Sequence, residues 1–229
     1  MSNEQLVELQ GSHNAWPMYR AMVGIGLVCA IIIVAVFRMT ATAIQHNKQQ
    51  LLQQSIYQLF PQADSFIPFV LDEHGVAQRL TGNPETAQFY AVYHQQNRLA
   101  GFAIQVQAMG YQDAFTLLYA YRPQPQMLDG YKILESRETP GLGSRIETDA
   151  AFVANFRQLP VPLNSDNSAL RHPLVVVKKG QKQQPWQIDT ISGATISSSA
   201  LARAVAGSTA YWLPKLQQQL EQFDHARFQ

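Results

Sequence analysis

The residues best suited to chemistry lie in the segment Asp-Thr-Ile-Ser-Gly-Ala-Thr at residues 189–195, which is followed by one isoleucine and three serines. Gly193 and Ala194 leave the backbone uncrowded, so the hydroxyl of Thr195 can be presented to the active site of another molecule. Threonine alone is a weak nucleophile, and no histidine or lysine stands close in sequence to activate it. We therefore expect a separate enzyme to modify Thr195.

The same segment also suits an anion. A phosphate on Thr195 would lie next to the N-terminus of a helix that we expect to begin near Ser198, where unpaired N–H groups and the helix dipole favour negative charge. The hydroxyls of Ser197 and Ser198 could add hydrogen-bond donors. An N-capped helix after a glycine turn explains the same residues, and the spacing by itself names no ligand.

A second segment, Glu-Thr-Pro-Gly-Leu-Gly at residues 138–143, combines polar residues with an accommodating turn. Proline followed by glycine fits the two central positions of a type II turn, where Gly141 supplies the positive φ. Gly143 permits a second close approach of the backbone. Such a loop can offer N–H groups to a ligand, although a simple tight turn after a strand is the alternative interpretation.

Composition and charge exclude several classes of protein. Lys and Arg number 17 against 16 Asp and Glu, which gives a net charge of +1, so we expect no nucleic-acid partner. The single cysteine, Cys29, excludes a disulfide framework and a Cys/His metal site, and no metal is expected. A serine hydrolase using Ser192 or Ser197 is disfavoured, because the chain has no Gly-x-Ser-x-Gly motif. We predict no catalytic residue.

A membrane segment accounts for the high apolar content, 46% against 14% charged residues. Residues 21–37 contain no charge and are bracketed by Arg20 and Arg38. At about 1.5 Å per residue this run covers about 26 Å, close to the roughly 30 Å of a bilayer core once interfacial residues extend it. We predict an N-terminal tail over residues 1–20 and a transmembrane anchor over residues 21–39.

A cleavable signal peptide is the alternative, because Ala41, Thr42 and Ala43 form an A-x-A pattern after the apolar run. The run is longer than the usual 7 to 15 residues of a signal peptide, and only Arg20 precedes it as a basic residue. We therefore favour a retained anchor. One basic residue, Arg20, precedes the apolar run and two, Arg38 and Lys48, follow it closely, so the positive-inside rule weakly favours a cytoplasmic C-terminus.

The remaining residues, 44–229, are sufficient for one domain. Leucine, isoleucine and phenylalanine at helical spacings predict an amphipathic helix over residues 45–60, which Pro61 ends. We expect a short helix over residues 148–159, capped by Thr148 or Asp149, and a final helix over residues 197–223 with a break near Pro214. Short runs rich in Val, Ile, Tyr and Phe predict strands at residues 88–94, 100–107, 115–121, 127–134 and 174–177.

These elements predict an α+β fold with an antiparallel sheet and flanking helices, preceded by one N-terminal transmembrane helix. The sheet is expected to be antiparallel because its connections have the length of hairpin turns, including one at residues 95–98. Phe102 and Ile104 alternate with Ala103 and Gln105, so we expect one face of this strand to be buried and the other to be partly solvated.

The two motifs together are more specific than either alone. Glu-Thr-Pro-Gly-Leu-Gly at residues 138–143, paired with Asp-x-x-Ser-Gly-Ala-Thr ending at Thr195 and preceded by one membrane segment, resembles the FMN-binding G subunits of bacterial Rnf ion-pumping electron transport complexes. The C subunits of Na⁺-translocating NADH:quinone reductases form a sister family. Both motifs match without a departure.

The resemblance implies that FMN is bound covalently through a phosphoester to Thr195. It implies that a separate flavin transferase installs the group and that Asp189 belongs to the signal which the transferase recognises. Ser192, Gly193 and Ala194 would shape the segment that enters the transferase. Four residues of the turn become expected flavin contacts, namely Glu138, Thr139, Leu142 and Gly143.

The function implied by the resemblance is electron relay, in a redox subunit of an ion-translocating oxidoreductase that is not catalytic alone. Its expected partners are the other membrane subunits of the complex, the membrane itself and the flavin transferase. The expected location is the bacterial inner membrane, as a single-pass protein whose domain faces the periplasm. A C subunit of a quinone reductase, a stand-alone FMN-binding membrane protein and a non-redox assembly module remain the alternatives.

Overall fold

The computed structural model describes residues 15–80, 86–94 and 98–223. Contacts between Cα atoms divide the chain into two compact units, Met1–Gln49 and Gln50–Gln229. Most of the predicted N-terminal tail and most of the turn predicted at residues 95–98 lie outside the described residues.

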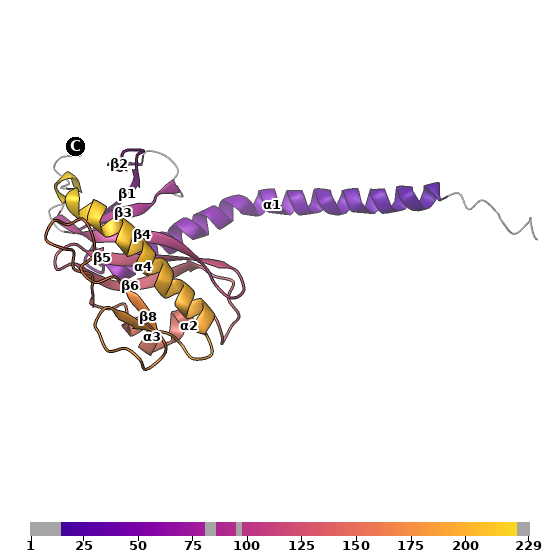
Figure 1. The fold of residues 1–229 in the computed structure, drawn as a ribbon. Helices are drawn as coiled ribbons and strands as arrows, with labels where there is room; N and C mark the ends of the chain where they lie inside the picture. Colours follow the sequence, from indigo (N-terminus) through magenta and orange to yellow (C-terminus); the bar gives the residue numbers. More distant parts are fainter. Residues whose placement is uncertain (1–14, 81–85, 95–97, 224–229) are drawn as a thin grey trace, which may run out of the picture. The chain divides into compact units, whose positions relative to one another are not determined.

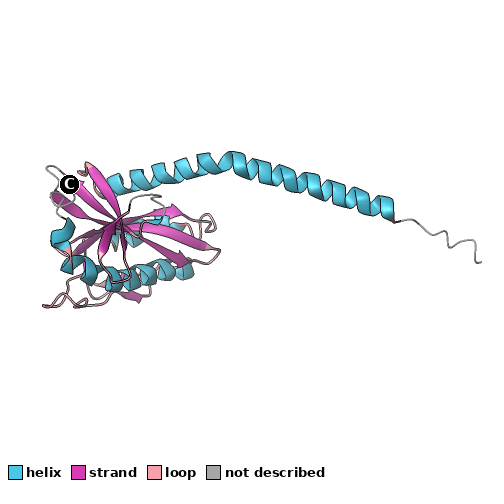
Figure 2. Ribbon diagram, turned by 90° about the horizontal axis from the view of Figure 1, so that it is seen from above, coloured by secondary structure: helices cyan, strands magenta, loops and turns pink. Residues whose placement is uncertain are grey.

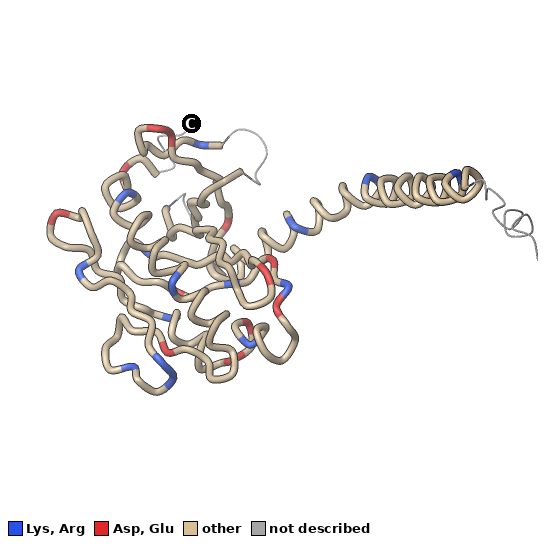
Figure 3. The backbone as a smooth tube through the Cα atoms, turned by 45° about the vertical axis from the view of Figure 1, so that its right-hand side comes forward, with Lys and Arg blue, Asp and Glu red and all other residues tan. Residues whose placement is uncertain are grey.

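The first element, α1, is a single helix over Trp16–Leu59. It contains a window of mean hydropathy 2.6, of which 0% is buried within the structure, so it is long and apolar enough to cross a membrane. In Figure 3 the helix carries basic residues and no acidic ones. The anchor and the amphipathic helix that the sequence predicts separately are parts of this one helix. It ends at Leu59 because Pro61 disfavours the α conformation in the residue before it.

Seven antiparallel strands form the main sheet, in the order β2-β1-β3-β4-β5-β6-β7. Four of the predicted strands are present in it as β3 to β6, with short connections between neighbours, which confirms the antiparallel sheet. The strands are β1 Ser65–Leu71, β2 Ala77–Arg79, β3 Phe89–His94, β4 Arg98–Met109, β5 Ala114–Arg122, β6 Met127–Glu135 and β7 Leu159–Pro160.

A second, two-stranded sheet pairs β8 (Val175–Val177) with β9 (Gln187–Asp189) in parallel. The sequence predicts β8 but not β9, which is only three residues long and has no run of β-branched residues. Pairing with β8 fixes β9, and β9 leads directly into the Ser-Gly-Ala-Thr segment.

The helices α2 (Arg145–Thr148), α3 (Ala150–Ala154) and α4 (Thr195–Gln218) follow the sheet in sequence, and the short 3-10 helix η3 covers Leu220–Phe223. Helix α4 crosses one face of the sheet (Figures 1 and 2). The predicted break near Pro214 is wrong. The helix continues to Gln218 because the residues around the proline, Leu213 and Leu216, are packed in the core and hold this turn in place.

Both faces of the sheet are covered over its centre. The main core lies between the sheet and α4, whereas a smaller cluster places Ile56, Leu59 and Phe60, at the end of α1, against Ala103 and Leu118. The predicted partly solvated second face of β4 is confirmed, because Ala103 is fully buried, Gln105 is half-buried and Gln107 is exposed. The sequence does not show which end of this face is covered, because the covering residues of α1 lie more than forty positions away.

Candidate functional site

The Pro-Gly segment forms the predicted type II turn. The N–H of Leu142 donates to the carbonyl of Thr139 at 3.1 Å, and Gly141 has a φ of +76°. The Ser144 hydroxyl oxygen accepts from the N–H of Gly141 at 2.9 Å. The Leu142 side chain is exposed and Thr139 is half-buried. The turn is therefore held by its own hydrogen bonds and presents Leu142 to solvent.

Glu138, which immediately precedes the turn, is a buried carboxylate with only 6% of its surface exposed. Its Oε1 accepts from the backbone N–H of Gln112 at 2.9 Å, and its Oε2 accepts from the hydroxyl of Ser197 at 2.6 Å. These partners lie in the β4–β5 connection and in the first turn of α4. Glu138 therefore joins three segments that are distant in sequence.

Two glycines leave room for this carboxylate. A Cβ added to Gly110 would lie 2.9 Å from Cδ of Glu138 and would overlap its Oε1. A Cβ added to Gly143 would lie 3.0 Å from Cβ of Glu138 and would overlap its Oε2. The close approach predicted at Gly143 is confirmed, and its partner is the Glu138 side chain.

The Ser-Gly-Ala-Thr segment turns sharply between β9 and α4. Gly193 has a φ of +83°, which an L side chain rarely adopts, and both Ser192 and Gly193 are exposed, whereas Ala194 is buried. Ser198 fastens the turn, because its Oγ accepts from the N–H of Ile191 at 3.0 Å and donates to the carbonyl of Ala194 at 2.8 Å. These bonds hold the segment without using the side chain of Ser192.

Thr195 is the first residue of α4 and is exposed. The helix therefore begins two residues before the predicted range 197–223 and three before Ser198, where the phosphate argument placed its start. The hydroxyl of Thr195 donates to the carbonyl of Ile191 over 3.3 Å, a long hydrogen bond. The N-cap residue, Ala194, makes no side-chain hydrogen bond, and the first turn of α4 has no acidic residue. The positive end of the helix dipole thus lies beside this hydroxyl.

Ser197 and Ser198 do not serve as the free donors that the sequence suggests. Both are buried, and their hydroxyl protons are donated to the Glu138 carboxylate and to the carbonyl of Ala194. Their positions on the first turn of α4 point them into the domain because the helix begins at Thr195. They hold the site together and leave Thr195 as its exposed hydroxyl on that turn.

Arg145, two residues after the Pro-Gly segment, bonds to the Ser-Gly-Ala-Thr segment. Its Nη1 donates to the carbonyl of Ser192 at 2.9 Å, and its Nη2 donates to Asp149 at 2.7 Å. The backbone N–H of Phe152 and then Arg145 lower the pKa of Asp149 below its ordinary value. The only sequence signal for Arg145 is a cationic residue two positions after Gly143, which by itself predicts no role.

Asp189 lies at the end of β9, half-buried, with Oδ1 accepting from the N–H of Lys182 at 3.1 Å. Its own N–H points toward the Oδ1 of Asn155 at 3.4 Å, an oxygen that also accepts from Nζ of Lys182 at 3.2 Å. The structure thus places Asp189 in a polar cluster of its own, six residues before Thr195.

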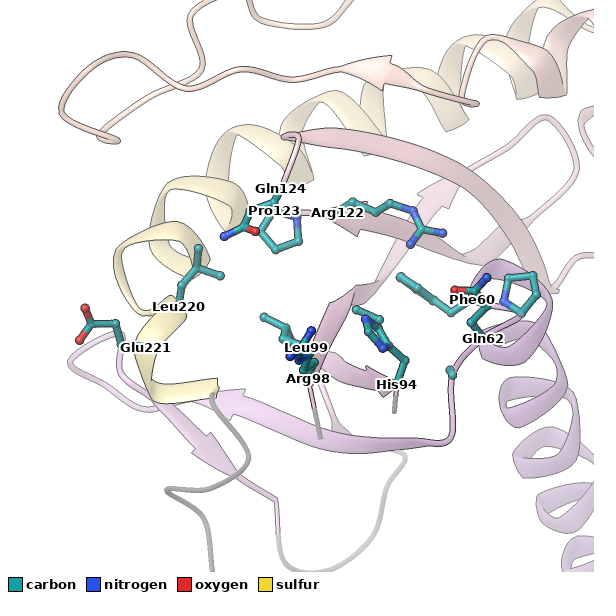
Figure 4. A pocket seen from close by; sticks show the side chains of 13 residues that line it. Phe60, Gln62, His94, Arg98, Leu99, Arg122, Pro123, Gln124, Leu220 and Glu221 are labelled. Atoms are coloured by element: carbon teal, nitrogen blue, oxygen red, sulfur yellow. The ribbon is translucent and has the colours of Figure 1, made fainter. Parts of the chain in front are cut away.

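A cleft of about 780 Å³ lies apart from both motifs (Figure 4). The guanidinium of Arg122 lies over the ring of Phe60 at 5.2 Å and pairs with Asp129 at 2.7 Å, so its charge is partly neutralised. The cleft is lined by Phe60, Pro61, Gln62, Ala63, His94, Arg98, Leu99, Ala100, Arg122, Pro123, Gln124, Leu220 and Glu221. It contributes no residue to the site around Glu138 and Thr195.

Charged residues of both signs are interspersed over the domain (Figure 3). Among the residues that the structure describes, no group of three or more His, Cys, Asp or Glu side chains could hold a metal ion. The polar side chains that the fold brings together around the two motifs include the exposed Thr195 hydroxyl, the Arg145 guanidinium and the buried Glu138 carboxylate.

Residues 110–208, which include both motifs, match the FMN-binding domain family. The chain is 27% identical over 190 residues to the G subunit of the ion-translocating oxidoreductase complex of Methanosarcina acetivorans, covering 83% of this chain and 90% of that protein. It is 29% identical over 200 residues to the protein of the same name from Pasteurella multocida, covering 85% and 92%.

Solved structures show the same fold. The crystal structure of NqrC from Shewanella oneidensis aligns with a TM-score of 0.51 at 15% identity, covering 72% of this chain and 86% of that one. The C subunit of the Na⁺-translocating NADH-quinone reductase from Parabacteroides distasonis aligns with a TM-score of 0.52 at 18% identity, covering 67% and 78%. Residues 110–208 thus match the FMN-binding domain family, and over most of its length the chain is similar to the G subunits of ion-translocating oxidoreductase complexes.

Proposed function

We propose that this chain is a membrane-anchored electron-transfer subunit of an ion-translocating oxidoreductase complex and that it carries FMN covalently on Thr195. The observation that carries the proposal is the exposed Thr195 hydroxyl at the uncapped N-terminus of α4, in a domain of the FMN-binding family. The names of its homologues support the assignment to a complex.

The residues around Thr195 fit a phosphodiester. The first-turn N–H groups of α4 and the helix dipole favour an anion there, and no acidic side chain in that turn opposes it. Arg145, whose charge is partly neutralised by Asp149, is bonded to the carbonyl of Ser192, three residues before Thr195. Its side chain is 35% exposed, so it has surface available for a phosphate oxygen.

Attachment is a group transfer that a separate flavin transferase must carry out with FAD as donor. The Thr195 oxygen bonds to the phosphorus on the riboflavin side, the pyrophosphate P–O bond breaks, and AMP leaves. The hydroxyl proton passes to a base of the transferase, and no electrons are exchanged. Modification removes only the 3.3 Å hydrogen bond from Thr195 to Ile191, so it costs the fold little.

When bound, FMN supplies one- and two-electron redox chemistry. This chain's own share is to hold the group at a fixed place on the turn between β9 and α4. The Glu138 carboxylate keeps the turn at residues 139–142 next to α4, so Thr139 and Leu142 remain candidates for flavin contacts. Asp189, held in its own polar cluster, is proposed as part of the transferase signal.

We further propose that α1 anchors the chain in the bacterial inner membrane and that the domain faces the periplasm. The apolar window of α1 supports the anchor. The partners would be the other membrane subunits of the complex. A C subunit of a Na⁺-translocating NADH:quinone reductase is the second candidate, and the similarity of its fold supports it.

The test is to co-express the full chain with a flavin transferase, denature it, and measure flavin fluorescence in the gel and the intact mass. Wild type should carry one FMN, and Thr195→Ala should carry none. Thr148→Ala is the matched control, because it removes an exposed threonine hydroxyl that lies outside both motifs. Thr195→Ser should retain some modification. A fluorescent band of unchanged intensity in Thr195→Ala would exclude the assignment, and a wild-type chain without flavin would favour an assembly role.

A further inference from the structure

The connection between β8 and β9 is strongly cationic. Of the 17 Lys and Arg residues in the chain, four lie in residues 167–188, a stretch that contains none of the 16 Asp and Glu residues. Three of the four, namely Lys178, Lys179 and Lys182, lie in the connection itself and are exposed. We call these three residues the lysine cluster. In a chain whose net charge is +1, they form a local concentration of positive charge.

Hydrogen bonds hold this connection in a fixed shape. The Oε1 of Gln187 accepts from the backbone N–H of Gln183 at 2.7 Å and from that of Gln184 at 3.0 Å. The Oδ1 of Asp189 accepts from the backbone N–H of Lys182 at 3.1 Å. Because the backbone is already ordered, binding a partner here costs little further conformational entropy.

Two members of the lysine cluster lie beside α3. The Nζ of Lys182 donates to the Oδ1 of Asn155, the C-cap residue of α3, at 3.2 Å. After the N–H of Phe152 and a neighbouring guanidinium, the charge of Lys179 is a further cause of the lowered pKa of Asp149, the N-cap residue of α3. The two cations therefore lie near opposite ends of one short helix, on the same side of the connection.

The charges of the lysine cluster are not compensated within the fold. In the described ranges 15–80, 86–94 and 98–223, none of the three lysines makes an ion pair. Two neighbouring carboxylates have other partners, because Asp149 pairs with Arg145 at 2.7 Å and the half-buried Asp189 accepts from a backbone N–H. The ammonium groups therefore remain available to carboxylates of another molecule, which they attract over about 10 Å at 0.1 M salt.

The lysine cluster adjoins the segment that is proposed to carry the flavin. Strand β9 leads from the connection directly into residues 189–195. Arg145, the partner of Asp149, also donates to the carbonyl of Ser192. A protein that docks on the lysine cluster is therefore close to the segment that ends at Thr195.

The chemistry of the lysine cluster fits carboxylates on another protein. Three lysines are few for a nucleic acid, whose binding proteins typically contact about 6 to 10 phosphates. An anionic bilayer attracts basic side chains without requiring a fixed arrangement. A loop whose backbone is held in place can instead match a fixed pattern of acidic side chains, which sets the orientation of the two proteins and favours the correct partner.

We propose that the lysine cluster docks an acidic patch on another subunit of the ion-translocating oxidoreductase complex. This inference rests on the proposed function, which supplies the complex, and extends it to a surface outside both motifs. The ion pairs orient the domain on its partner and speed their association, and their contribution falls as salt is added.

The first test is cross-linking in the intact complex, purified through a tag on the full chain. A carbodiimide joins a lysine amine to a carboxylate that contacts it, as an amide. Mass spectrometry should find members of the lysine cluster joined to Asp or Glu residues of a second subunit. Lys132, an exposed lysine on β6, is the matched control and should form no such link. The lysine cluster should also be acetylated more slowly in the complex than in the isolated chain.

The second test reverses the charges. Lys178→Glu with Lys179→Glu leaves the bond of Lys182 to α3 in place, so flavin content and thermal unfolding should stay as in wild type. Recovery of the second subunit should fall about tenfold at an ionic strength of about 0.05 M, and the difference from wild type should shrink at about 0.5 M. Arg79→Glu with Lys132→Glu makes the same change of charge at exposed sites elsewhere and should behave as wild type.

Recovery at the wild-type level in the charge-reversed variant, without cross-links from the lysine cluster to another subunit, would overturn the inference and leave the proposed function intact. Slower acetylation of the cluster in the chain alone, seen in nanodiscs of anionic lipid but not of zwitterionic lipid, would assign the surface to the bilayer and overturn the inference as well. A wild-type chain that carries no flavin and recovers no other subunit would instead refute the proposed function.

Discussion

Truncation of Glu138 should destabilise the domain more than truncation of any exposed acidic residue. Glu138→Ala removes two hydrogen bonds to a charged acceptor, each worth about 1.5 to 3 kcal/mol. It also leaves the hydroxyl of Ser197, which is 1% exposed, without its acceptor. Because such terms are not additive, we expect a total loss of about 3 to 5 kcal/mol in the free energy of unfolding.

The assay is thermal and urea unfolding of the full chain in detergent, followed by circular dichroism. At about 2 to 4 °C per kcal/mol for a domain of this size, Glu138→Ala should lower Tm by roughly 10 °C. Glu138→Gln keeps the shape of the side chain, but its amide nitrogen cannot accept from Ser197, so it should cost roughly 1 to 2 kcal/mol. Glu73→Ala removes an exposed carboxylate and should stay within about 0.5 kcal/mol of wild type.

The result that would refute this reasoning is an unfolding free energy for Glu138→Ala that matches that of Glu73→Ala. The carboxylate would then not be the connection among the β4–β5 loop, the Pro-Gly turn and α4. A loss of flavin from Glu138→Ala without a loss of stability would instead make it a flavin contact, as the resemblance implies.

The same geometry leads to three other expectations. Gly143→Ala should destabilise the fold because its Cβ would overlap the Glu138 carboxylate, whereas Gly207→Ala, in open space on α4, should stabilise the fold by about 0.5 to 1 kcal/mol. Urea unfolding of both variants measures the two effects, and equal effects would contradict the expectation. Because the folded state lowers the pKa of Asp149, the ionised carboxylate stabilises the fold at pH values above the ordinary pKa of 3.8, and this stabilisation is lost as pH falls through the lowered pKa. The free energy of unfolding, measured from pH 7 to pH 3, should therefore differ less between wild type and Asp149→Asn at the acid end. A difference that does not change with pH would exclude the effect. Asp189→Ala should reduce the stoichiometry of attached flavin and leave the fold intact, whereas Leu142→Ala should permit attachment but shift the reduction potential of the flavin. Flavin stoichiometry and a redox titration of both variants check this. Full flavinylation of Asp189→Ala together with loss of flavin from Leu142→Ala would show that the two residues have the opposite roles.

Local patterns in the sequence predict the elements whose determinants lie close together along the chain. The apolar run predicts the first part of α1, alternating β-formers predict β3 to β6, and proline followed by glycine predicts the turn that Gly141 completes. Asp149 caps α3, one of the two caps predicted, with its side chain accepting from the N–H of Phe152. Each of these depends on propensity, hydrophobic period or a single φ angle, which neighbouring residues encode.

Contacts between distant segments decide the geometry of the site. Glu138 meets Gln112 and Ser197 across 26 and 59 positions, and Arg145 meets Ser192 across 47. No local pattern encodes these pairs, because sheet register and the packing of α4 set them. Residue types and spacing predict the candidate site residues and predict that Gly143 allows a close approach. Contacts made in the folded chain establish that Glu138 fills that space, that Ser197 and Ser198 face inward, and that Thr195 alone among the hydroxyls in the first turn of α4 faces solvent.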